Sequence, residues 1–121
     1  PIRPKVKPGA TFAEAMRALA KATLAAVEER TPVAVGRLTG LAYTLTSAEL
    51  GSRVHESTKG SYDVGAEWLR TFDPRELPMG PEHLVRVLHV LIEGLVMQRI
   101  LTPDLCPDDV FYAAFGALAR E

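Results

Sequence analysis

Apolar side chains recur every three or four residues along most of this chain, and this spacing is what most constrains its fold. A period near 3.6 residues matches the α-helix, whereas a half-buried strand needs apolar and polar residues to alternate. No stretch alternates for long, so we expect no strands. Alanine and leucine, both good helix formers, supply 31 of the 121 residues. The sequence therefore predicts an all-α fold.

Five helices are expected, separated by breaks that contain proline or glycine. The first opens with Thr11 and Glu14, which have the spacing of a capping box, and ends near Arg30. Serine, threonine and glycine crowd the middle of the third helix, around residues 57–61, where we expect a kink. The other helices are expected after the cap Thr31, from about Ser47 to Phe72, from Pro81 to about Leu101, and from Asp108 to Leu118.

The segment before these helices has a different composition. Residues 1–9 hold three prolines and three basic side chains, which is typical of an extended arm or linker. Residues 10–121 are expected to form one all-helical domain, because a mass of 13.2 kDa is ordinary for a single hydrophobic core. We expect this domain to be a five-helix bundle.

Charge and cysteine content exclude several classes of protein. Fourteen basic and fifteen acidic residues give a net charge of −1, without the basic footprint of a free-standing nucleic-acid binder. A single cysteine, Cys106, excludes an internal disulfide. The longest apolar stretch, residues 84–100, is interrupted by charged side chains, so it does not predict a membrane span. We see no secretory signal and expect a cytoplasmic protein.

Motifs for catalysis or metal binding are not apparent. The chain has neither a phosphate-binding loop nor a dinucleotide fingerprint, so we expect no cofactor. His89 and Glu93 share a helix face, but this spacing is more typical of an ion pair than of a metal site. Cys106 is expected to be a small buried residue. The arginines show no sign of converging on one site, and we expect no enzymatic activity.

The third helix contains the best candidate for a ligand site. Its apolar stripe has bulky residues at both ends and small ones between, at Ser57, Ser61 and Gly65. Small side chains at such positions either leave a cavity or let a neighbouring helix pack tightly, and both interpretations stay open. If a cavity forms, we expect it to be lined by Leu41, Leu45, Ser57, Ser61, Trp68, Phe72, Leu88 and Leu91.

The fourth helix is apolar on almost every side, apart from a narrow stripe that contains Arg86 and Glu93. A helix of this kind is buried on more than one side. One five-helix core cannot cover so much apolar surface, so we expect the chain to form a homodimer in which the last two helices of each copy make a four-helix bundle. The expected interface residues are Val87, Val90, Gly94, Leu101, Phe111, Phe115 and Leu118.

The last forty residues carry a resemblance to a known family. The stretch HLVRVLHVLIEGLVMQRILTPDLCPDDVFYAAFGALAR resembles the C-terminal end of TetR-family transcriptional regulators. In that family an apolar run is followed by Gly-Leu, here Gly94-Leu95, and then by a turn that contains proline, here Leu101-Thr102-Pro103. A final helix rich in alanine, leucine and phenylalanine comes next. The earlier helices match only in number and approximate length.

The resemblance implies a function. TetR-like regulators join an N-terminal helix-turn-helix domain to a helical domain that binds a small inducer and dimerises through its last two helices. We find no helix-turn-helix segment here, so the resemblance implies the effector-sensing and dimerisation domain alone, which would reach DNA only through the missing domain. The expected effector is a hydrophobic or amphipathic small molecule. A helical dimerisation module without a ligand is the main alternative, and a small helical enzyme is a third.

Overall fold

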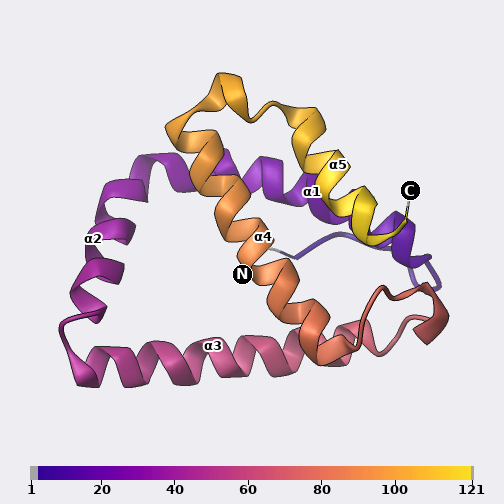
Figure 1. Ribbon diagram of the computed structural model, residues 1–121, viewed down its shortest axis with the longest axis horizontal. Helices are drawn as coiled ribbons and strands as arrows, with labels where there is room; N and C mark the ends of the chain where they lie inside the picture. Colours follow the sequence, from indigo (N-terminus) through magenta and orange to yellow (C-terminus); the bar gives the residue numbers. More distant parts are fainter. Residues whose placement is uncertain (1–2, 121) are drawn as a thin grey trace.

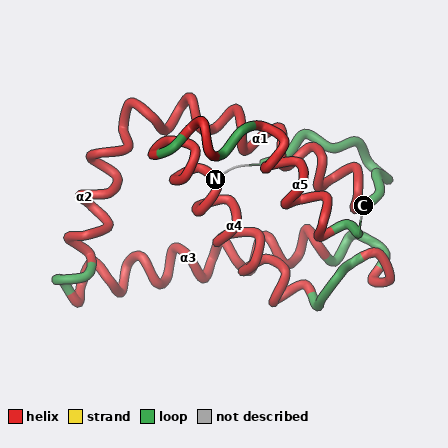
Figure 2. Tube along the Cα trace, turned by 45° about the horizontal axis from the view of Figure 1, so that its top comes forward, coloured by secondary structure: helices red, strands yellow, loops and turns green. Residues whose placement is uncertain are grey.

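Helices make up all the regular secondary structure in the computed structural model, which describes residues 3–120 (Figures 1 and 2). This confirms the prediction of an all-α protein. The α-helices are α1 (Phe12–Arg30), α2 (Ala34–Thr44), α3 (Ala48–Leu69), α4 (Pro81–Leu101) and α5 (Asp108–Leu118). Three short 3₁₀ turns connect them, namely η1 (Thr31–Val33), η2 (Pro74–Glu76) and η3 (Pro103–Leu105).

Local sequence explains where the helices begin. The hydroxyl of Thr11 accepts a hydrogen bond from the Glu14 amide at 3.1 Å, and the Glu14 carboxylate accepts one from the Thr11 amide at 3.2 Å. The predicted capping box of α1 is therefore confirmed. Ser47 caps α3 in a similar way, by accepting a hydrogen bond from the Leu50 amide at 3.3 Å. Pro81 occupies the first turn of α4, where its missing N–H has no consequence.

Two local predictions were wrong. The third helix runs without a break from Ala48 to Leu69, although a kink was expected around residues 57–61. Serine and glycine lower helix stability by at most about 1 kcal/mol each, and these residues are exposed, so no neighbour bends the helix there. The second helix begins later than expected, because the residues from Thr31 to Val33 form the 3₁₀ turn η1.

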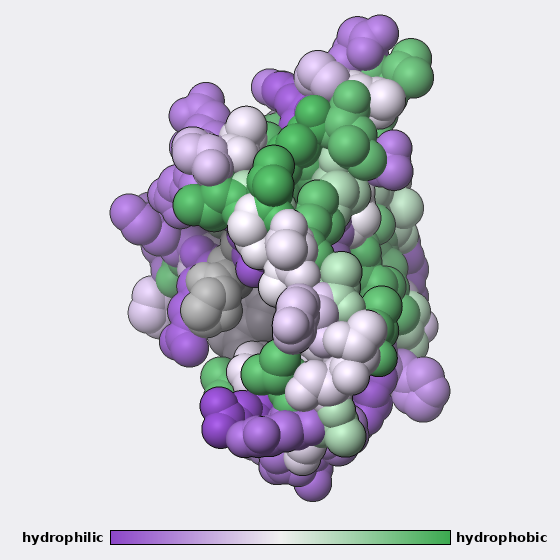
Figure 3. All heavy atoms as spheres, turned by 90° about the vertical axis from the view of Figure 1, so that its left-hand side faces the viewer, coloured by the Kyte–Doolittle hydropathy of each residue, from purple (hydrophilic) through white to green (hydrophobic). Residues whose placement is uncertain are grey.

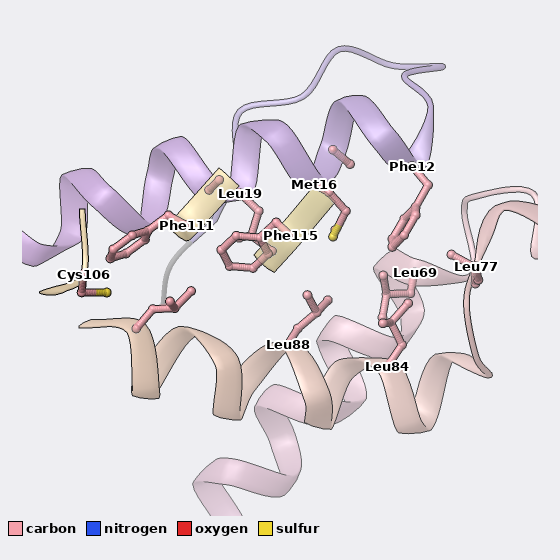
Figure 4. Close-up of a cluster of buried hydrophobic side chains, with 13 residues drawn as sticks. Phe12, Met16, Leu19, Leu69, Leu77, Leu84, Leu88, Cys106, Phe111 and Phe115 are labelled. Atoms are coloured by element: carbon pink, nitrogen blue, oxygen red, sulfur yellow. The ribbon is translucent and has the colours of Figure 1, made fainter. Parts of the chain in front are cut away.

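The core lies where α1, α4 and α5 meet (Figure 4). Phe111 and Phe115 of α5 point between α1 and α4, and both side chains are fully buried. At the other end of the core, the ring of Phe72 makes edge contacts with Phe12 at 5.8 Å and with Trp68 at 5.2 Å between centroids. Aromatic pairs of this geometry add to the stability that burial alone provides.

The remaining helices extend away from this core. Helices α1, α2 and α3 form three sides of an open frame, and α4 crosses the frame diagonally (Figure 1). No residue of α2 is buried, and α3 buries only Ala66 and Leu69, near its C-terminal end. The five helices therefore do not all surround one common core. Within residues 3–120, no helix is long and apolar enough to cross a membrane.

Candidate functional site

Helix α4 carries an apolar face that is largely exposed in the part of the chain that the structure describes. Val90 and Leu101 are 62% and 61% exposed, and Gly94 lies between them on the same face. A Cβ atom added at Gly94 would meet no other atom within 4 Å. Val87 lies on the same face and is half-buried. This face can therefore receive another helix at close range.

On α5, the structure corrects part of the predicted interface. Phe111 and Phe115 are fully buried against α1 and α4, and Leu118 packs half-buried against the same core. Their side chains serve the subunit's own core, and the two phenylalanines leave no surface for a second copy. Another face of α5 is exposed instead, and it carries Val110, Ala113 and Ala117. The rings of Phe111 and Phe115 fill the space between α1 and α4, and the face that carries Val110, Ala113 and Ala117 remains outside.

We call these exposed or half-buried residues of the last two helices the α4–α5 surface. It consists of Val87, Val90, Gly94, Leu101, Val110, Ala113 and Ala117. Small or β-branched residues make up most of this surface, which would let another helix approach closely.

A second group of uncovered apolar side chains lies on the frame. Hydrophobic atoms gather on the side of the molecule where α2 faces the viewer (Figure 3). We call this group the α2–α3 stripe, and it consists of Leu38, Leu41, Leu45, Leu50 and Val54, all of them exposed. Exposed apolar side chains that gather on one side of a molecule are typical of places where a ligand or another protein binds.

The residues predicted to line a ligand cavity do not come together. Leu41, Leu45, Ser57 and Ser61 are exposed on the frame, whereas Leu88 lies in the core, and Trp68, Phe72 and Leu91 pack half-buried against it. Of these residues, Ser57, Ser61 and Trp68 lie on one stripe of α3. Its C-terminal end packs on the core, while its N-terminal part extends beyond the core into the frame.

The small residues of α3 were expected either to leave a cavity or to let a neighbouring helix pack tightly. At Gly65 the structure shows tight packing. A Cβ added there would lie 2.4 Å from Cγ2 of Val85 on α4. Helix α4 therefore packs directly against the backbone of α3 at Gly65, and no cavity exists at this point. Ser57 and Ser61 have no comparable neighbour and are exposed.

Two surface hollows lie elsewhere. One, of about 290 Å³ between α3 and α4, is lined by Tyr62, Asp63, Ala66, Glu67, Arg70, Glu82, Val85 and Arg86. Its arginines are already engaged: Arg70 pairs with Glu67 and Glu82, and the Arg86 guanidinium lies 5.4 Å from the centre of the Tyr62 ring.

The other hollow, of about 250 Å³, adjoins the loop between α3 and α4. Of the eight residues predicted to line a cavity, only Phe72 contributes to either hollow. The observed hollows are therefore lined by different residues from those predicted for the cavity.

An ion-pair cluster on α4 joins three helices. Arg37 of α2 donates through Nη2 to both carboxylate oxygens of Glu93, at 3.1 and 3.0 Å, and Arg30 of α1 donates through Nη1 to Oε1 at 3.2 Å. Partial burial raises the pKa of Glu93, but the Arg37 and Arg30 guanidiniums outweigh burial and hold that pKa below its ordinary value. The carboxylate is therefore ionised at neutral pH.

The sequence indicated different partners for these residues. Glu93 was expected to pair with His89, but the His89 ring lies edge-on to Tyr62, with 5.3 Å between centroids. The two arginines that bind Glu93 are 63 and 56 positions away along the chain. Periodicity within one helix contains no information about such distant partners.

Chemistry-bearing residues are sparse in the described part of the chain. Cys106 is buried, as expected. Residues 3–120 contain no group of three or more histidine, cysteine, aspartate or glutamate side chains that could hold a metal ion. Comparisons with protein-family models, curated proteins and solved structures found no match.

Proposed function

We propose that this chain is the dimerisation and effector-sensing domain of a TetR-like transcriptional regulator, a cytoplasmic protein that reaches DNA through a separate helix-turn-helix domain. The observation that supports dimerisation best is the α4–α5 surface, on which Val90 and Leu101 stay exposed on either side of the open Gly94. The resemblance of the last forty residues to such regulators supports the same surface.

The energetics favour a second copy of this chain as the partner. Burying an exposed valine or leucine side chain contributes about 1.5–3 kcal/mol, and a two-fold axis uses each residue twice. A stable dimer buries about 800 Å² on each partner. That is about a tenth of the 7965 Å² that this chain exposes. The exposed faces of two helices of 21 and 11 residues can supply such an area.

Sedimentation velocity over a range of protein concentrations tests this proposal. The wild-type chain is expected to sediment as a dimer at micromolar concentration, and Gly94→Glu as a monomer with unchanged helix content. Gly60→Glu is the matched control, because Gly60 is also an open, exposed helical glycine but lies on α3. A wild-type monomer at high micromolar concentration, or a dimer that survives Gly94→Glu, would contradict dimerisation through this surface.

Effector sensing is supported by a different observation, the α2–α3 stripe. The eight residues that the sequence predicted to line a cavity do not support it, because they do not come together. The stripe has apolar side chains on two helices and no charged member, which suits a hydrophobic or amphipathic small molecule. Ser57 and Ser61 lie one and two turns beyond Val54 on α3 and could donate hydrogen bonds to polar atoms of the same molecule.

An apolar dye, anilinonaphthalene sulfonate, can probe the stripe. We expect the dye to bind the wild-type chain, and Leu41→Glu and Val54→Glu to weaken its binding. Val35→Glu serves as the control because Val35 is exposed on α2 but is not part of the stripe. If the dye does not bind, or if all three variants weaken binding equally, a dimerisation module without a ligand is the better description.

A further inference from the structure

Helix α2 is attached to the rest of the domain almost only at its two ends. None of its residues is buried, and its close packing is with its chain neighbours η1 and α3. The well-packed helix pairs of the structure join α1, α3, α4 and α5 to one another but do not include a pair of α2 with α1, α4 or α5. Little apolar packing therefore holds α2 in place, and such elements open at low free-energy cost.

One polar contact links α2 to α4, through Arg37 in the first turn of α2. Within residues 3–120, the two hydrogen bonds from Arg37 to Glu93 are the side-chain hydrogen bonds that link α2 to α4. Both carboxylate oxygens are engaged, and Arg30 holds one of them from α1. The Arg30 side chain is 20% exposed, whereas the side chains of Arg37 and Glu93 are 45% and 36% exposed, so salt can screen the Arg37–Glu93 pair.

We propose that Glu93 is a latch that holds α2 against α4, and that α2 opens as an arm when the latch is released. The hinges are the 3₁₀ turn η1, next to Arg37, and the turn at residues 45–47 before α3. Leu38 directly follows Arg37 and Leu41 lies about one turn beyond it; these two leucines are 40% and 44% exposed, whereas Val35 is 80% exposed. Opening the arm increases the exposure of Leu38 and Leu41, which are only partly exposed while the latch is closed.

The latch also connects two surfaces. Glu93 directly precedes Gly94 on the α4–α5 surface, and Arg37 directly precedes Leu38 on the α2–α3 stripe. A molecule that displaces α2 would therefore break the contact of Arg37 with Glu93 on α4, next to Gly94. The proposal of a latch depends only on the ion-pair geometry, and it does not require that the chain dimerises or binds an effector.

Amide hydrogen exchange of the full chain, followed by mass spectrometry, tests the latch. Glu93→Gln keeps side-chain size, Arg37→Gln shortens the side chain, and both substitutions keep helix propensity and remove the charge pairing. Each is expected to speed exchange in α2 by about three- to tenfold and to leave α1 and α5 unchanged. The double variant should match Glu93→Gln, because Glu93→Gln already removes the charge pairing of Arg37 as well as that of Arg30. Glu49→Gln is the control, since Glu49 pairs with Arg53 of its own helix at 2.9 Å.

If the amide exchange rate of α2 is unchanged in both single variants, the latch proposal is wrong. It is also wrong if the double variant shows the sum of the two single effects on that rate. If Glu93→Gln accelerates exchange in every helix, Arg37→Gln decides, because the Arg37 side chain is 45% exposed and lies on a helix that has no buried residue. Acceleration confined to α2 in that variant supports the latch, and no acceleration contradicts it. High salt gives a second readout: it should speed α2 exchange in the wild-type chain but not in Glu93→Gln.

Discussion

Replacing Gly65 by alanine should destabilise the domain, although alanine is the better helix former. Alanine at a helix interior gains about 1 kcal/mol over glycine. At Gly65, however, the new Cβ would lie 2.4 Å from Cγ2 of Val85, well inside the 3.5–4.0 Å at which carbon atoms meet favourably. Val85 is β-branched and has little rotamer freedom, so α3 and α4 must separate or Val85 must leave its rotamer. Overpacking of this kind costs about 1–3 kcal/mol.

Gly60→Ala in the same helix is the reference for this comparison. A Cβ at Gly60 meets nothing within 4 Å, so this substitution should stabilise the domain by about 0.5–1 kcal/mol. Urea unfolding followed by circular dichroism measures both free energies of unfolding. We expect Gly65→Ala to fall below Gly60→Ala by about 1–3 kcal/mol, and Gly65→Ala/Val85→Ala to recover part of the helix-propensity gain. If Gly65→Ala stabilises the domain as much as Gly60→Ala does, the close contact between α3 and α4 does not exist.

Three further substitutions or conditions follow from the structure. Phe115→Ala should lower the free energy of unfolding by about 3–5 kcal/mol in urea titrations, whereas Tyr112→Ala on the exposed side should cost under about 1 kcal/mol. Thr11→Ala removes the cap of α1 and should cost about 1 kcal/mol, measured in the same way. The pKa of Glu93 is lowered in the folded state, so its stabilising contribution is complete above the ordinary value of 4.5 and is lost as pH falls through the folded-state pKa. Thermal unfolding between pH 3 and pH 7 should show a smaller loss of stability at acid pH in Glu93→Gln than in the wild-type chain.

Much of the local structure could be predicted from the sequence because it depends on neighbouring residues. The cap at Thr11, the first turn of α4 at Pro81 and the all-helical class follow from spacing and from backbone hydrogen bonding. The buried Cys106 is a similar case, because a lone cysteine without a nearby partner usually behaves as a small apolar residue.

The failures have a different origin. Periodicity tells which residues share a face but not which face meets the core. On α5 both faces are apolar, and side-chain volume decides that Phe111 and Phe115 point inward while Ala113 points outward. On α3 a single stripe passes from the core at Trp68 to the exposed frame at Ser57, because the helix is longer than the core beside it. The contact of Glu93 with α1 and α2 depends on tertiary structure alone.

The central claim is that a second copy of the chain covers the α4–α5 surface, and isotope-filtered NMR on mixed samples tests it most directly. One copy carries ¹³C-labelled methyl groups on a deuterated background, and the other is unlabelled and protonated. We predict intermolecular nuclear Overhauser effects at the methyl groups of Val90, Leu101 and Val110, and none at Val35 or Val64, although Val64 is 57% exposed. Effects at Val35 and Val64 with none at Val90 would contradict the claim, as would the absence of any intermolecular effect at millimolar concentration.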